Sequence, residues 1–241
     1  MTQLNIPMPR EQLERIVRQV VRQDFAARLM AGEPQLSAAY TPNLVVNISA
    51  RHLHISQEHL RKLFGPAAEL TVYRWLYQPG EFAAEQRVTI IGPRNRAIEN
   101  VRILGPMRKH TQVEISATDS VALGIDAKVR PSGKIEGTPG CVLVGPAGVV
   151  ELKQGVIRAE RHVHMNFDDA RRYGVKNGDR MKLKISSACA TTLEDLLVRA
   201  DATSKLEVHL DTDEGNAADL DNATKVELLP QDCACKCKKD A

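Results

Sequence analysis

The chain has 241 residues, of which 43% are hydrophobic and 26% charged, an ordinary composition for a globular protein with one large or two small domains. The net charge of +3 is too small to indicate a nucleic-acid partner, and no basic run with interleaved aromatic residues occurs. No apolar stretch of about 18 residues predicts a membrane span, and the first ten residues lack the order of a secretory signal.

Residues 11–29 carry the periodicity of an amphipathic helix. At 100° per residue, five apolar side chains share an arc of roughly 140°: Leu13, Ile16, Val17, Val20 and Val21. Residues 31–42 contain one glycine and two prolines and are expected to form a linker. A short helix on a linker cannot cover its own apolar face, so it must dock back on the protein, pair with a copy of itself or bind something else.

From Leu44 onward the sequence changes to short β-type runs such as LVVNIS, VTIIG, VRILG, TQVEIS and CVLVG, separated by turn signals such as QPGE and GTPG. This spacing is typical of β-barrels or β-sandwiches. Two short helices are expected at Gln57–Phe64 and Phe167–Tyr173. Each follows a Ser or Asn that can cap it and precedes a glycine.

An internal repeat connects these two helices. Arg51-His-Leu-His-Ile-Ser56 aligns with Arg161-His-Val-His-Met-Asn166, and each segment runs into its capped helix. The shared order and the matching helix indicate a duplication. The sequence therefore predicts a mainly β fold of two related small β-barrels with short capping helices.

The repeat carries two histidine pairs, His52 with His54 and His162 with His164. Residues i and i+2 of a strand point to the same face, so each pair presents two imidazoles side by side. Neutral imidazole is a preferred zinc ligand. One such pair is also compatible with a polar strand face, but its occurrence at equivalent places of a repeat favours a metal site.

Catalytic zinc usually has about three protein ligands, so two ions need further donors. His209 and Glu114 alternate with apolar neighbours in their strands and are candidates. For Glu114, however, the pattern alone favours a solvated position. A guanidinium near these segments would suit an oxyanion substrate, although ordinary surface charge is the alternative. The arginines near the segments are Arg51, Arg161, Arg102 and Arg108.

No Walker motif, Gly-x-Gly-x-x-Gly after a strand or Gly-x-Ser-x-Gly elbow occurs, so nucleotide hydrolysis and serine-triad chemistry lack support. The residues alone indicate a two-barrel metalloprotein with two zinc ions and an anionic substrate. They do not choose the reaction.

The five cysteines are unevenly placed. Cys141 and Cys189 stand alone, whereas Cys233, Cys235 and Cys237 crowd the end of the chain. This set is typical of a reduced, cytoplasmic protein rather than of a disulfide framework. Residues 231–241 have a Cys-x-Cys-x-Cys pattern compatible with metal binding, but we expect a disordered tail.

Long segments resemble the PduL-type phosphate propanoyltransferases: NISARHLHIS, LYQPGEFA, VRILGPMRKHTQVEISATD, ALGIDAKVRPSGKIEGTPG, GVIRAERHVHM and EVHLDTDEGNAAD. The resemblance covers about Leu44 to Asp219. It implies a phosphotransacylase that converts an acyl-CoA and phosphate into an acyl phosphate and CoA. It also implies two interleaved β-barrels with the active site between them. Residues 43–51 with 156–230 would form the first barrel and residues 52–155 the second.

The resemblance further implies the site residues and two zinc ions per chain. One zinc would be held by His52, His54, Glu114 and His209, and the other by His162 and His164 with phosphate or water. Arg108 matches the phosphate-binding arginine. The positions that match contacts to CoA are Ile48, Ser49, Ala50, Arg102 and Asn216. One segment, SSACATTLEDLLVRA, departs from the family pattern by lacking an arginine in its turn.

Family members are typically cargo of bacterial microcompartments that degrade propanediol or related substrates. Residues 11–29 resemble their encapsulation peptides, which implies a shell or cargo protein as partner and a place inside a cytoplasmic microcompartment. We also expect a homo-oligomer. Two alternatives remain at this point: a dinuclear zinc hydrolase of a thioester or phosphoester, and a non-enzymatic microcompartment adaptor.

Overall fold

The computed structural model describes residues 43–231. The helix expected at 11–29, the linker and the cysteine-rich residues from 232 on lie outside this range. Within it, the expectation of a mainly β fold with short helices is confirmed. No helix of the described chain combines the length and apolar character that crossing a membrane requires.

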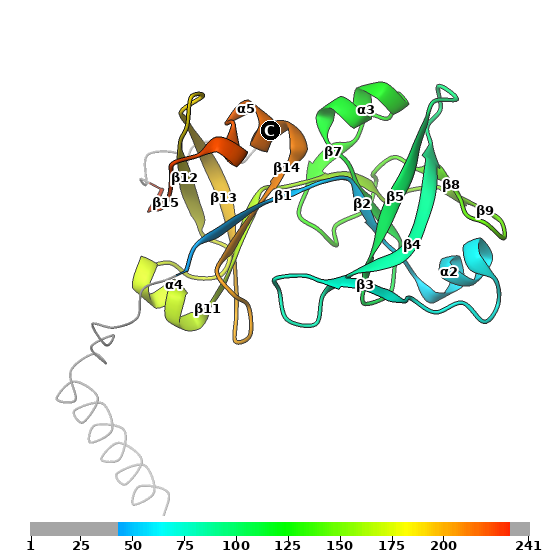
Figure 1. Cartoon of the computed structure of the whole chain (residues 1–241), viewed down its shortest axis with the longest axis horizontal. Helices are drawn as coiled ribbons and strands as arrows, with labels where there is room; N and C mark the ends of the chain where they lie inside the picture. Colours follow the sequence, from blue (N-terminus) through cyan, green and yellow to red (C-terminus); the bar gives the residue numbers. More distant parts are fainter. Residues whose placement is uncertain (1–42, 232–241) are drawn as a thin grey trace, which may run out of the picture. The chain divides into compact units, whose positions relative to one another are not determined.

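One curled sheet has nine strands (Figure 1). They run in the order β7-β10-β6-β2-β5-β4-β8-β9, and β3 pairs with β4. Their bounds are β2 (His52–His54), β3 (Val72–Trp75), β4 (Phe82–Ile91), β5 (Ala97–Gly105), β6 (Gln112–Glu114), β7 (Lys128–Arg130), β8 (Cys141–Val144), β9 (Val149–Leu152) and β10 (Val156–Ala159).

The other sheet has six strands in the order β1-β14-β11-β13-β12-β15. Their bounds are β1 (Val45–Ser49), β11 (His162–Asn166), β12 (Arg180–Ser186), β13 (Thr191–Asp201), β14 (Glu207–Asp211) and β15 (Lys225–Pro230). A 3-10 helix at Leu220–Asn222 precedes the last of them.

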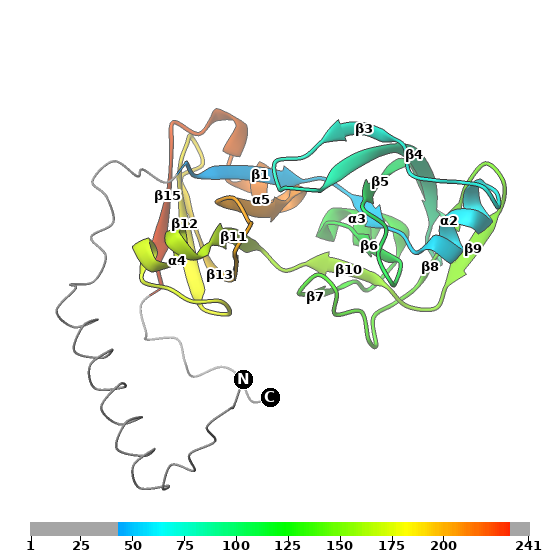
Figure 2. The same cartoon turned by 90° about the horizontal axis from the view of Figure 1, so that it is seen from below.

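The two sheets exchange one strand each. β1 leads into β2 of the nine-stranded sheet but pairs in parallel with β14 of the six-stranded sheet. Conversely, β10 leads into β11 of the six-stranded sheet but pairs in parallel with β6 and β7. Figures 1 and 2 show the blue β1 passing from one sheet to the other. The family resemblance implied that residues 43–51 and 156–230 share one barrel. Hydrogen bonding places β1 in the six-stranded sheet and residues 156–159 in the nine-stranded sheet.

The repeat seen in the sequence sets the local structure after each exchanged strand. The helices α2 (Gln57–Phe64) and α4 (Phe167–Tyr173) follow β2 and β11 with the predicted bounds. The side chains of Ser56 and Asn166 accept hydrogen bonds from the first turn of each helix and so stabilise its start.

A second pair of related helices follows the strands that carry Glu114 and His209. These helices are α3 (Ala117–Leu123) and α5 (Thr212–Ala217), and each begins with a capping box. An arginine of each repeat bonds the acidic residue of the corresponding box: Arg51 Nε lies 3.2 Å from Asp119, and Arg161 Nε lies 2.8 Å from Glu214. The duplication therefore extends to strand, cap, helix and ion pair.

Each sheet has its own core, built mainly of Val, Ile and Leu side chains, and the core of the six-stranded sheet also contains Met165 and Met181. The residue between each pair of histidines, Leu53 or Val163, is fully buried on the core face of its strand. Because side chains alternate along a strand, this burial directs both histidines of a pair to the opposite face. Burying each such side chain stabilises the fold by about 1.5–3 kcal/mol, so the core fixes the direction of the histidines.

Candidate active site

The strand register brings four polar side chains together in each half of the protein. On β2 and β6, His52 lies opposite Glu114 and His54 opposite Gln112. On β11 and β14, His162 lies opposite His209 and His164 opposite Glu207. Side chains opposite each other in an antiparallel pair lie on the same face with Cβ atoms about 5 Å apart. The duplication thus builds two equivalent clusters of candidate ligands.

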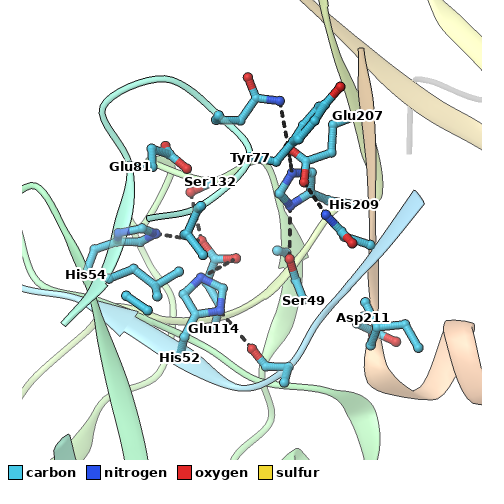
Figure 3. Close-up of a pocket in the computed structure, with 18 of the residues that line it drawn as sticks. Ser49, His52, His54, Tyr77, Glu81, Glu114, Ser132, Glu207, His209 and Asp211 are labelled. Atoms are coloured by element: carbon cyan, nitrogen blue, oxygen red, sulfur yellow. Dashed lines mark hydrogen bonds and ion pairs between the residues drawn. The ribbon is translucent and has the colours of Figure 1, made fainter. Parts of the chain in front are cut away.

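The first cluster consists of His52, His54 and Glu114, whose ligand atoms lie within 4.8 Å of one another. The Glu114 carboxylate lies 3.5 Å from His52 Nε2 and 3.8 Å from His54 Nε2. Its Oε1 also accepts hydrogen bonds from Ser132 Oγ at 2.8 Å and Gln112 Nε2 at 2.6 Å. Figure 3 shows Glu114 between the two rings with Ser132 beside it. The carboxylate is therefore held in one orientation by polar neighbours.

The second cluster consists of His162, His164 and His209, again with ligand atoms within 4.8 Å of one another. The ring centroid of His209 lies 5.0 Å from that of His162 and 5.2 Å from that of His164. This grouping differs from the expected one, in which His209 joined His52, His54 and Glu114. The difference arises from the pairing of β14 with β11, which places His209 beside the second histidine pair.

Hydrogen bonds at Nδ1 orient several of these rings. His52 Nδ1 lies 2.9 Å from the carbonyl of Ala50, and His162 Nδ1 lies 2.8 Å from the carbonyl of Glu160. A carbonyl only accepts, so both rings donate Nδ1–H and leave the Nε2 lone pair free for a ligand bond. Such an outer partner is the usual companion of a metal-binding histidine. Both carbonyls lie where the chain crosses between the sheets, so the strand exchange itself orients the ring.

Burial also keeps the histidines in the form that binds metal. It lowers the pKa of His54 to about 3, helped by the neighbouring His52 and Arg108. It lowers the pKa of His162 to about 3 and of His164 to about 4, and in both His209 adds to the effect. These rings are therefore neutral at physiological pH.

The carboxylate of the first cluster is ionised. Burial raises the pKa of Glu114, but His52, His54, the hydrogen bond from Ser132 and His162 together lower it to about 2. In addition, Nδ1 of His54 is buried and has no hydrogen-bond partner within the described structure. Two sets of imidazoles, one with a carboxylate, match the donors that zinc prefers. The residues present therefore fit two divalent ions.

Both clusters line one cavity of about 640 Å³. Its walls come from both sheets, and the volume is in the range of small-molecule sites. Of the positions expected to contact CoA, four line the cavity: Ile48, Ser49, Ala50 and Arg102. Asn216 lies exposed in α5 and is not part of the cavity wall. Ser49 Oγ lies 3.0 Å from His209 Nδ1, which links β1 to the second cluster (Figure 3).

Arg108 is half-buried in the cavity wall. Its Nη1 donates to Ser132 Oγ at 3.2 Å, and Ser132 in turn donates to Glu114. Burial lowers the pKa of Arg108, while the charges of Glu114 and Glu81 oppose this effect. An arginine remains protonated in proteins, so a fixed positive charge lies next to the first cluster.

Three further polar residues of the cavity wall did not emerge from the sequence: Gln78, Arg199 and Glu207. Glu207 accepts from Asn47 Nδ2 at 2.5 Å and from Gln78 Nε2 at 2.6 Å. Arg199 lies beside His164 in the parallel pair of β13 and β11. The signal for Glu207 was its position two residues before His209, which puts both on one strand face. Gln78 and Arg199 carry no comparable local signal.

A model of the phosphate propanoyltransferase family matches residues 45–221. A phosphate propanoyltransferase of Planctopirus limnophila is 57% identical over 232 residues, 95% of each chain. Enzymes of the same name from Thermotoga maritima and Rhodobacter capsulatus are 49% and 40% identical. The match to the Thermotoga enzyme covers 78% of this chain and 90% of that enzyme, and the match to the Rhodobacter enzyme covers 91% of this chain and 98% of that enzyme.

Proposed function

The chain belongs to the phosphate propanoyltransferase family of acyltransferases, and from this premise we propose that it transfers an acyl group, propanoyl, from CoA to inorganic phosphate with the help of two zinc ions. The observation that carries the metal dependence is the pair of equivalent clusters in one cavity. The relatives are named as phosphate propanoyltransferases, so they support neither the zinc hydrolase nor the non-enzymatic adaptor.

Each ion has its own set of protein ligands in this proposal. His52, His54 and Glu114 hold the first, and His162, His164 and His209 hold the second. A bound zinc supplies a Lewis acid that stabilises the developing oxyanion and the departing thiolate. Three ligands per ion leave coordination positions open for substrates, as is usual in catalytic zinc sites.

Arg108 binds the incoming phosphate. Its guanidinium presents a rigid fork of donors that matches two phosphate oxygens. The hydrogen bond to Ser132 holds the fork in place next to Glu114. Arg199, on β13, also lines the cavity and adds a second positive charge to it. Holding phosphate beside the thioester removes most of the entropic barrier to their encounter.

No protein nucleophile takes part in this scheme. A phosphate oxygen attacks the thioester carbonyl, the carbon–sulfur bond breaks, and CoA leaves as the thiol with the proton of the phosphate. Of the described cysteines, Cys141 is buried in the core of the nine-stranded sheet and Cys189 is exposed, and neither lines the cavity. Because acyl phosphate and thioester are both activated acyl groups, the same residues serve the reverse reaction.

Replacing Arg108 tests the phosphate assignment. We expect Arg108→Ala to raise the KM for phosphate by at least about tenfold, since charge-assisted hydrogen bonds to an oxyanion are lost. The zinc content per chain should not change. The matched control is Arg96→Ala, which removes an exposed arginine outside the cavity. Equal loss of phosphate use and of zinc would contradict the assignment.

We further propose that residues 11–29 bind a shell or cargo protein and so direct the enzyme, as a homo-oligomer, into a bacterial microcompartment. These residues lie outside the described structure, and the support is their amphipathic pattern. The described part already contains both clusters and Arg108. Deleting residues 1–32 should therefore leave acyl transfer unchanged and abolish co-purification with shells. An inactive, unfolded product would contradict the targeting role.

A further inference from the structure

The two strand ladders that carry the candidate ligands both end at a pair of ligands. The last pair of the β2–β6 ladder is His52 opposite Glu114. The last pair of the β11–β14 ladder is His162 opposite His209. Beyond these pairs, no backbone pairing within the described residues joins the same two strands. The ends of a ladder are where it opens most easily, so the spacing of each ligand pair depends on what connects the strands next.

An ion pair lies directly beyond each ladder end. Arg51 and Arg161 each precede the first histidine of their repeat. Arg51 Nε lies 3.2 Å from Oδ2 of Asp119, in the segment that follows β6. Arg161 Nε lies 2.8 Å from Oε1 of Glu214, in the segment that follows β14. Each ion pair therefore joins the two strands at the point where their hydrogen bonds end.

The two carboxylates are themselves fixed close to a ligand. Asp119 Oδ2 accepts a hydrogen bond from the amide of Ser116, and Ser116 Oγ accepts one from the Asp119 amide. Glu214 and Asp211 exchange the same two bonds, at 3.1 and 2.8 Å. Ser116 and Asp211 each lie two residues beyond the ligand of their strand, and Asp211 marks the passage from β14 into α5 (Figure 3). An arginine that bonds such a carboxylate thus holds a strand end.

The positions of the two arginines indicate that the bond itself is their shared feature. Arg51 is part of the cavity wall, whereas Arg161 is not. Contact with a substrate in the cavity is therefore open to only one of them. Both nevertheless bond the capping-box carboxylate that follows the partner strand. The duplication has kept this connection in both halves of the protein.

We propose that Arg51 and Arg161 are positioning residues that clamp the two ladder ends and so hold the ligands of each zinc ion at binding distance. This inference rests on the proposed function, in which each cluster binds one ion. Arg51 acts on the first cluster and Arg161 on the second. Ligands that are already held in place lose less conformational entropy when the ion binds. Loss of one clamp therefore weakens one zinc site and leaves the other unchanged.

Zinc affinity of the full-length chain, measured by competition with a chromophoric chelator, tests the two clamps separately. Arg51→Ala should raise the dissociation constant of one zinc ion by about tenfold, the effect usual for groups that orient metal ligands. Arg161→Ala should do the same to the other ion, and the double variant should weaken both. Removing a positive charge near a cation would by electrostatics alone tighten binding. Unchanged or tighter zinc binding in the two variants would therefore overturn the proposal.

Asp119→Asn separates the ion pair from the helix cap. The amide oxygen still accepts the capping hydrogen bond, but the charge that holds Arg51 is lost. This variant should weaken the same zinc ion as Arg51→Ala, and the two substitutions together should cause no additional loss, because they break one bond. Additive losses would contradict the clamp. Arg171→Ala is the matched control, since it breaks an exposed ion pair with Asp168 on α4 and should affect neither ion. Circular dichroism shows whether each variant is folded.

Kinetics at saturating zinc distinguish a clamp from a substrate contact. With both ions bound, Arg51→Ala should leave the KM for phosphate and for propanoyl-CoA unchanged. A raised KM for phosphate together with unchanged zinc affinity would make Arg51 a phosphate-binding residue and overturn the proposal.

The two claims fail separately. If the native chain binds no zinc, the metal dependence in the proposed function is wrong, and the clamps have no ion to act on. If the native chain binds two zinc ions and Arg51→Ala and Arg161→Ala bind both with native affinity, the clamps alone are wrong.

Discussion

His209 on β14 lies directly opposite His162 on β11, with their rings stacked at 5.0 Å and their planes 13° apart. The equivalent position in the other half of the protein, opposite His52, is occupied by Glu114. The duplication has therefore kept the register of the two strand pairs and changed one donor. One cluster contains three imidazoles, and the other contains two imidazoles and a carboxylate.

This grouping predicts how zinc content responds to substitution. His209→Ala should lower zinc from about two to about one ion per chain, because a site with only two protein ligands loses most of its affinity. Combining His209→Ala with His162→Ala and His164→Ala should cause no further loss of zinc. Combining His209→Ala with His52→Ala and His54→Ala should remove the remaining zinc ion. Metal analysis of the purified variants checks both combinations.

The opposite pattern would contradict the grouping. If His209→Ala combined with His52→Ala and His54→Ala retained one ion, His209 would serve the first cluster, as the family resemblance implied. Circular dichroism of each variant provides the control for folding.

Gln78 lies between β3 and β4 and is a buried contact to residues of and next to β14 in the six-stranded sheet. Its Nε2 donates to Glu207 at 2.6 Å and to the carbonyl of Lys205 at 2.9 Å, and its Oε1 accepts from the Lys205 amide at 3.1 Å. Gln78→Leu leaves these groups without that partner. Urea unfolding should show a loss of about 1–3 kcal/mol, the usual penalty for unsatisfied buried polar groups.

Gln86→Leu is the matched control for this loss. Gln86 also makes three hydrogen bonds, to the backbone of Glu69 and to Thr71, but solvent reaches them. Water can replace the lost partner there, so the destabilisation should be clearly smaller. Equal losses in the two variants would contradict a special role for Gln78.

The lowered pKa values of the histidines predict the pH dependence of the metal-free protein. In the unfolded chain, His54, His162 and His164 take up protons near the ordinary pKa of 6.5, whereas in the folded protein they do so only near pH 3 to 4. The unfolded state therefore binds more protons in this window. Stability is fully present above pH 6.5 and falls as the pH drops, by up to about 1.4 kcal/mol per pH unit for each ring.

Glu114 acts in the same direction at lower pH. Its pKa is lowered from 4.5 to about 2, so its contribution is lost only below pH 4.5. Thermal unfolding of chelator-treated protein between pH 5 and pH 8 isolates the histidines. A midpoint that is constant between pH 5 and pH 7 would show that these rings are not held neutral.

The sequence predicted the local elements well. Both capped helices have the predicted bounds, and the histidine pairs lie on one face of their strands, because capping and alternation are determined by near neighbours. The partners across the sheets were not predictable in this way. The place of β10, the grouping of His209 and the role of Gln78 all depend on which distant strands pair, and no local pattern encodes that choice.

The measurement that tests the central claim most directly is the release of free thiol from propanoyl-CoA by the purified protein, with and without phosphate. We predict release that requires phosphate and yields one propanoyl phosphate per thiol, with about two zinc ions per chain. Release at the same rate without phosphate, with propanoate as product, would contradict the account and indicate a hydrolase.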